Sequence, residues 1–277
     1  MSREEKYFNA PVQLLQGFMN DSFKCLDNFF DYSVYYYVLT HKDTNLDFER
    51  AYKMAEKDLK IRCGRIEDTY KNGVKLYSKI PEGSVKVGIN KSLFFDFYEN
   101  HNKKTDFEKA CFLAFTAIKS IMQSKPYCKI TNLYLWSRMD GKEKAVNDIS
   151  ELSPEIQFYA NEYQTKKIKE ELRNNWNLKY YGRYVRGCYY SFSLSLDKLI
   201  FEAEKRRKKN INAINKEKDK EAYSKAMQML ELCKGSSRPI IRSYTNYNKT
   251  NQATKSGVNR YNVNELWHRP DRPEYVE

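Results

Sequence analysis

The chain has 277 residues, of which 41% are hydrophobic and 15% aromatic, and it carries a formal net charge of +13. This length and apolar fraction predict one large or two small folded domains with ordinary hydrophobic cores. The basic excess, 49 Lys and Arg against 36 Asp and Glu, favours polyanionic partners such as DNA or RNA.

The cysteines and the hydropathy pattern predict a cytoplasmic protein. The six cysteines include no Cys-x-x-Cys pair, which is typical of reduced, buried thiols and not of a disulfide framework or a zinc site. The N-terminus lacks a hydrophobic signal region, and no apolar stretch approaches the length of a membrane span. We therefore expect no membrane partner.

Residues 1–100 predict a helical N-terminal domain. Apolar side chains recur at three- and four-residue steps between Phe18 and Tyr37, and a second helix is expected after Asp47. Asn72-Gly73 then interrupts the helical pattern. Residues 74–89 are therefore predicted to form a short hairpin or a broken helix.

Residues 101–204 predict a second domain that begins with a buried helix. Thr105 and Glu108 have the spacing of a capping box. The helix that they open runs to about Gln123 and is apolar nearly all round, as expected of a central helix. Further along, Ser153-Pro154 suits the start of another, shorter helix.

A basic helix is predicted after a break at 161–164, with Thr165 as its N-cap. Ile168, Leu172 and Trp176 form its inward face. Its outer face is predicted to carry four basic side chains of the kind that meet phosphates and guanine edges: Lys166, Lys167, Lys169 and Arg173.

Two alternating aromatic runs follow this helix and predict a β-hairpin around Arg186-Gly187. Lys179 lies in the first run. Arg183 and Arg186 are expected near the tip, where basic side chains commonly touch the backbone of a nucleic acid.

The order of helix, short turn, basic helix and two-stranded ribbon resembles the winged helix-turn-helix family of DNA-binding proteins over roughly residues 105–200. The resemblance implies that the helix before the wing lies in the major groove, so that Lys166, Lys167, Lys169 and Arg173 become candidate contacts by position. The fold expected is mainly α, with a helical first domain and a winged-helix second domain. The style of the chain also looks similar to accessory proteins of phages, plasmids and other mobile elements, including replication initiators and regulators.

A basic helical extension is predicted over 205–235, and an extended or disordered tail over 236–277. The tail contains Trp267 and Arg269, which belong to a short motif suited to docking a partner or the body of the protein. The extension carries a cluster that would add sequence-independent affinity for nucleic acid: Lys205, Arg206, Arg207, Lys208 and Lys209.

The sequence offers little support for catalysis. His41, His101 and His268 are far apart, and no metal-binding histidine pair or phosphate-cradling glycine loop occurs. We therefore expect a protein that is not an enzyme and has no catalytic residues, metal, cofactor or small-molecule substrate.

The leading hypothesis is a nucleic-acid-binding protein of a phage or other mobile element, with DNA and RNA both open as partners. One alternative is a phage-encoded inhibitor of a host defence ribonucleoprotein, of the anti-CRISPR type, which would bind the effector complex or its guide RNA. A further alternative is a structural or assembly protein that associates with itself through aromatic surfaces.

Overall fold

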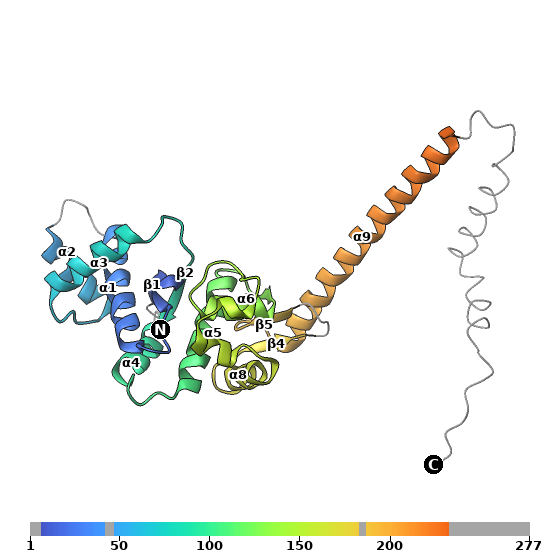
Figure 1. The fold of residues 1–277 in the computed structure, drawn as a ribbon. Coiled ribbons are helices and arrows are strands. Elements are labelled where there is room, and N and C mark those ends of the chain that lie inside the picture. Colours follow the sequence, from blue (N-terminus) through green and yellow to red (C-terminus); the bar gives the residue numbers. More distant parts are fainter. Residues whose placement is uncertain (1–6, 42–46, 183–186, 233–277) are drawn as a thin grey trace, which may run out of the picture. The chain divides into compact units, whose positions relative to one another are not determined.

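The computed structural model describes residues 7–41, 47–182 and 187–232. These residues are mainly helical and form nine α-helices, two short 3-10 helices and five strands (Figure 1). The described residues up to Arg206 belong to one compact unit, and those from Arg207 to Leu232 belong to a second. The predicted tail and four of the predicted binding residues lie outside the described ranges: Arg183, Arg186, Trp267 and Arg269.

The first part of the compact unit is a helical layer packed on a two-stranded ribbon. The ribbon pairs β1 (Tyr7–Pro11) antiparallel with β2 (Lys86–Asn90), and α1 packs on β1 and on α3. The remaining elements are the 3-10 helix η1 (Val12–Leu15), α1 (Ser22–His41), α2 (Phe48–Leu59), α3 (Ile66–Lys79) and α4 (Lys91–Glu99). The two predicted helices correspond to α1 and α2, whereas the ribbon was not predicted.

α3 continues through Asn72-Gly73, so the prediction of a hairpin or broken helix over 74–89 is wrong for the first part of that range. The glycine serves close packing of α3 against α1 and does not end the helix. A Cβ atom at Gly73 would lie 2.6 Å from the Cβ of Tyr35 and 3.0 Å from the carbonyl oxygen of Asp31. The later part of the range forms β2, whose partner is β1 at the start of the chain.

α5 (Asp106–Met122) is the central helix of the compact unit and packs on both β2 and α6. The predicted capping box is confirmed, because the Thr105 hydroxyl accepts from the Glu108 amide at 3.2 Å and Glu108 accepts from the Thr105 amide at 2.8 Å. Phe112 on α5 is fully buried and stacks on Phe18 at 5.0 Å. Residues from both halves of the compact unit therefore share one hydrophobic core.

The basic helix α8 packs on α5 and β4 and is one of the elements that follow α5 in the chain. In chain order they are β3 (Cys128–Ile130), α6 (Asn132–Met139), the 3-10 helix η2 (Ile149–Glu151), α7 (Pro154–Tyr159), α8 (Glu162–Asn175), β4 (Lys179–Tyr181) and β5 (Cys188–Ser191). β4 and β5 pair antiparallel, so the predicted hairpin is confirmed, and β5 lies between β4 and β3. The third strand, β3, was not predicted.

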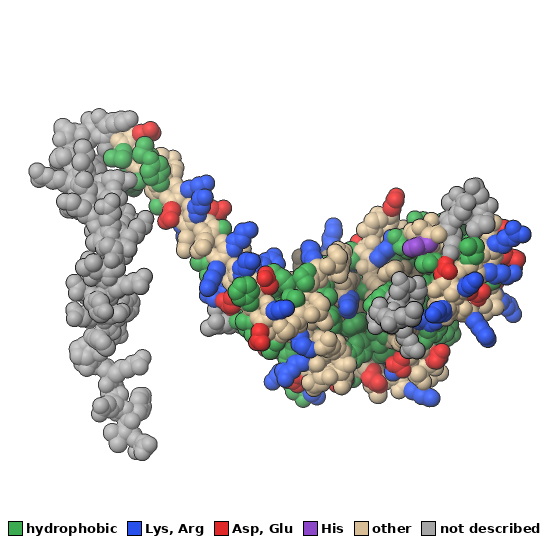
Figure 2. Space-filling model, turned by 180° about the vertical axis from the view of Figure 1, so that it is seen from behind, with side chains coloured by type: hydrophobic (Ala, Val, Ile, Leu, Met, Phe, Trp, Pro, Cys, Tyr) green, Lys and Arg blue, Asp and Glu red, His purple; other side chains and the backbone are tan. Residues whose placement is uncertain are grey.

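α9 (Leu196–Leu232) begins within the compact unit and continues into the second unit. In its first part Leu199 and Ala203 are buried, and Glu204 accepts a hydrogen bond from the Tyr181 hydroxyl at 2.9 Å. Beyond Arg206 none of the described side chains is buried. Figure 2 shows lysine and arginine side chains along α9 with aspartate and glutamate among them.

The five cysteines in the described ranges are free and buried, as the sequence predicted: Cys25, Cys63, Cys111, Cys128 and Cys188. Cys233 lies outside those ranges. Among the helices described, none combines the length and the apolar character that crossing a membrane requires.

The contact at Gly73 gives a first prediction. We expect Gly73→Ala to lower the free energy of unfolding by about 1–3 kcal/mol because the added methyl group overpacks the α1–α3 contact. Alanine's better helix propensity, about 1 kcal/mol, opposes this loss. Urea denaturation measures the difference. Gly64→Ala is the control, because a Cβ there meets no atom within 4 Å. A Gly73→Ala protein as stable as the wild type would contradict the close approach.

Asp31 carries a buried carboxyl group on the face of α1 that packs on α3. It is 7% exposed, and its Oδ2 accepts from Asn72 Nδ2 of α3 at 2.8 Å. Burial raises the pKa of Asp31 from 3.8 to about 6, although the hydrogen bond from Asn72 works in the opposite direction. The folded protein therefore holds this proton over a pH range in which the unfolded chain has already lost it.

The second prediction follows from this pKa. The stability that Asp31 contributes is complete below pH 3.8 and is lost as the pH rises to about 6. Asp31→Asn should remove this dependence and raise the free energy of unfolding at neutral pH by about 1–3 kcal/mol relative to wild type. Urea denaturation of both proteins at several pH values tests it. Parallel stability curves for the two proteins would show that Asp31 does not carry the effect.

Candidate nucleic-acid interface

The first turn of α8 is fixed by two side-chain hydrogen bonds. Asn161 is the N-cap, and its Oδ1 accepts from the Gln164 amide at 2.9 Å. Thr165, which the sequence predicted as the N-cap, lies within the helix, so that prediction is wrong. Its side chain is buried, and its hydroxyl accepts from the indole N–H of Trp136 at 2.9 Å. The helix starts earlier than predicted because Asn161 already provides a capping oxygen.

The inward face of α8 agrees with the prediction. Ile168 and Leu172 are buried in the core of the compact unit. Trp176, just after the helix, is half-buried and packs on Phe115 at 4.9 Å and on Phe97 at 6.3 Å between ring centroids. This apolar contact holds α8 as a rigid support for its outer side chains.

Three of the predicted basic residues are exposed on α8, namely Lys166, Lys167 and Arg173. None of them forms an ion pair with another residue in the described part of the chain. The ammonium group of Lys167 lies 4.5 Å from the ring centroid of Tyr163. Glu170 is exposed between these cations, and Glu162, four residues before Lys166, is also exposed, so this side of α8 carries three positive and two negative charges.

Lys169 does not lie on the outer face, which corrects its predicted placement. It is four residues after the buried Thr165 and therefore lies beside it on the inward side of the helix. Its ammonium group donates to Asn132 Oδ1 at 3.3 Å and lies 5.7 Å from the ring centroid of Tyr190. Burial lowers the pKa of Lys169.

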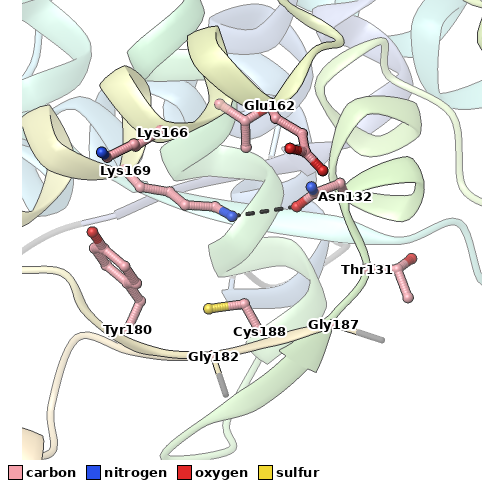
Figure 3. A pocket seen from close by; sticks show the side chains of 10 residues that line it. Thr131, Asn132, Glu162, Lys166, Lys169, Tyr180, Gly182, Gly187 and Cys188 are labelled. Atoms are coloured by element: carbon pink, nitrogen blue, oxygen red, sulfur yellow. Dashed lines mark hydrogen bonds between the residues drawn. The ribbon is translucent and has the colours of Figure 1, made fainter. Parts of the chain in front are cut away.

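Lys169 helps to line a cavity of about 670 Å³ between α8 and the β4–β5 hairpin. Figure 3 shows its side chain extending toward Asn132 at the start of α6, with Tyr180 and Cys188 on the strands below it. Glu162 and Lys166 on α8 line the same cavity. The described residues thus form a hollow directly beneath the basic helix, with both polar and apolar surface in its lining.

The other described basic residues do not join the exposed group on α8. Lys179 lies on the opposite face of β4 from Tyr180, which lines the cavity, because alternate side chains of a strand point to opposite faces. Arg206 is exposed at the end of the compact unit. Lys205 also lies in the compact unit, whereas the other members of the cluster lie in the second unit. They point in different directions around the helix axis, since successive residues turn by about 100°: Arg207, Lys208 and Lys209.

Two exposed aromatic residues beside the basic face were not predicted as part of the site. Phe158 is 63% exposed and Tyr163 is 65% exposed, and they flank the turn at Ala160 and Asn161 between α7 and α8. Helical phase could have identified Phe158, because it lies opposite the apolar side of α7 that Ile156 occupies. Exposed rings next to cations suit contacts with sugars and bases.

Two carboxylates that lie close together in the sequence, Asp140 and Glu143, have structural roles. Asp140 is buried and accepts from the amide and the hydroxyl of Ser153 at 3.1 and 2.6 Å, which fixes the start of α7. Glu143 accepts from the amide of Val85 at 2.9 Å and so joins the loop after α6 to the segment before β2.

A comparison with known proteins finds no match, whether to a protein-family model, to a curated protein or to a solved structure.

The hydrogen bond that fixes α8 provides the third prediction. Thr165→Val keeps the side-chain shape but leaves the buried Trp136 N–H without an acceptor. We expect it to lower the free energy of unfolding by about 1–3 kcal/mol in urea denaturation. Thr165→Ser, which retains the hydroxyl, should lose less. A valine variant more stable than the serine variant would contradict this role.

Proposed function

We propose that the chain is a non-enzymatic nucleic-acid-binding protein and that residues 105–200 act as a winged helix-turn-helix. The order of elements supports this proposal. A helix (α5) precedes a strand (β3), further helices end in the basic helix α8, and a hairpin follows in which β5 pairs with both β4 and β3. In this proposal α7 and α8 are the helix-turn-helix and the hairpin is the wing.

The observation that carries the proposal is the display of Lys166, Lys167 and Arg173 on a helix whose other side is buried. The backbone of this helix is already held in place by the core. Its cations can therefore neutralise phosphates without other parts of the protein having to become ordered. The exposed Glu162 and Glu170 reduce the net charge of this face, so a few well-placed contacts are expected and not a broad basic surface.

Duplex DNA is the partner that this geometry favours. The major groove of B-DNA admits an α-helix, whereas the major groove of A-form RNA is too deep and narrow for side chains to reach its bases. α8 has 14 residues, enough to present Lys166 and Arg173, which are about two turns apart, to one groove. We also propose an origin in a phage or other mobile element, which rests on the composition of the chain and on the winged-helix resemblance of its sequence.

The fourth prediction concerns the exposed cations of α8. Replacing Lys166, Lys167 and Arg173 together with alanine should weaken binding to duplex DNA roughly tenfold or more and reduce the slope of log affinity against log salt by up to about 3. Fluorescence anisotropy over a salt series measures both quantities. The fold should be retained because all three side chains are exposed.

The matched control replaces Lys53 and Lys57, two exposed lysines on α2, with alanine. It changes the net charge by two without touching α8, so its DNA affinity should stay within about twofold of wild type. Equal losses in both variants would mean that only net charge matters. Wild-type protein that binds neither duplex DNA, single strands nor structured RNA would overturn the proposal and favour the inhibitor or assembly alternatives.

A further inference from the structure

The cavity beneath α8 brings together polar groups from four separate elements. Asn132 comes from the start of α6, Lys166 and Lys169 from α8, and Tyr180 and Cys188 from the two strands of the hairpin. Glycines at 182 and 187 also line it, so no side chain fills the cavity from those two positions. Its volume of about 670 Å³ lies within the range typical of sites for small molecules or single groups of a larger ligand.

The ammonium group of Lys169 is incompletely paired at the wall of this cavity. An ammonium group has three donors. Among the described residues its hydrogen-bond acceptor is Asn132 Oδ1, at a long 3.3 Å, and no carboxylate lies within ion-pair distance. A partly buried cation in this state gains stability from a ligand that supplies further acceptor oxygens.

The net positive charge of the side chains that line the cavity favours an anionic ligand. Lys166 and Lys169 contribute two cations, and Glu162 contributes one carboxylate. The hydroxyls of Thr131 and Thr165 already accept hydrogen bonds from Tyr134 and Trp136 inside the protein. A hydroxyl that accepts a hydrogen bond keeps its own O–H donor, so these hydroxyls and the lysine ammonium groups can all donate to a compact group with several acceptor oxygens.

We propose that the cavity between α8 and the β4–β5 hairpin is a phosphate-binding site in which Lys169 and Lys166 donate to the phosphate oxygens. Lysine is a common phosphate ligand, because its compact charge and rotatable donors adapt to tetrahedral oxygen groups. The start of α6, at Asn132, adds the partial positive charge of a helix N-terminus on the same side of the cavity.

The phosphate has two possible sources with the same chemistry. It is either a backbone phosphate of a nucleic acid that contacts α8 or the phosphate of a free small molecule. The first source rests on the proposed function, whereas the site itself does not. Two measurements separate them: calorimetric titration with inorganic pyrophosphate, and anisotropy with duplex DNA over a salt series.

The fifth prediction uses Lys169→Met in the full chain. Methionine keeps a long side chain but has neither the charge nor the donors, so pyrophosphate affinity should fall at least roughly tenfold. If the occupant is a backbone phosphate, the salt slope for duplex DNA should also fall by about 0.9. The control is Lys129→Met, which changes an exposed lysine on β3 that does not line the cavity. It should leave pyrophosphate affinity unchanged.

The outcomes are distinguishable. Loss of pyrophosphate binding with an unchanged DNA slope assigns the site to a free phosphate compound. Wild-type pyrophosphate affinity in Lys169→Met, or no pyrophosphate binding by the wild type, overturns the site. If Lys169→Met does not fold, Lys166→Met at an exposed position replaces it and should weaken pyrophosphate binding at least roughly twofold. Loss of DNA binding on changing Lys167 and Arg173, with pyrophosphate binding intact, would support the proposed function independently.

Discussion

The hydrogen bond from the Trp136 indole to Thr165 fixes the rotation of α8 about its own axis, and both proposed sites depend on that rotation. A buried N–H without an acceptor costs about 1–3 kcal/mol, so rotations that break the bond are unfavourable. Ile168 and Leu172, buried on the same side, oppose the same rotations. The outcome is that Lys167 faces solvent, while Lys169, two residues later, points toward Asn132 and the ring of Tyr190.

The rest of the compact unit holds α6, α7 and α8 in place around this contact. α5 packs on both α6 and α8, and its other contacts include β2 from the first part of the chain. Buried and half-buried carboxylate contacts hold the long loop between α6 and α7, with Asp140 bonded to Ser153 and Glu143 bonded to Val85. These polar contacts have directional geometry, which apolar packing alone does not provide. The basic helix is therefore supported by the whole core.

The cations of α8 differ in their surroundings, and this difference separates two kinds of binding. Lys167 and Arg173 are exposed, so their attraction for a polyanion is long-ranged but screened by salt. Lys169 is partly removed from water, so its interactions are screened less and depend more on exact contact geometry. In the proposed complex Lys167 and Arg173 would control the rate of association, and Lys169 would hold one phosphate.

The sequence by itself determined those elements that depend on residues close together in the chain. The capping box at Thr105, the apolar repeat of α1, the inward face of α8 and the alternation of the hairpin all depend on neighbours within a few residues. Tertiary structure decided what depends on distant partners. The packing of α1 on α3 makes Gly73 a position of close contact. The strand pairs β1–β2 and β3–β5, and the hydrogen bond from Lys169 to Asn132, join residues that are far apart in the sequence. The periodicity of apolar residues indicates which side of a helix is buried. The neighbouring elements decide whether a side chain at the edge of that side is buried or exposed.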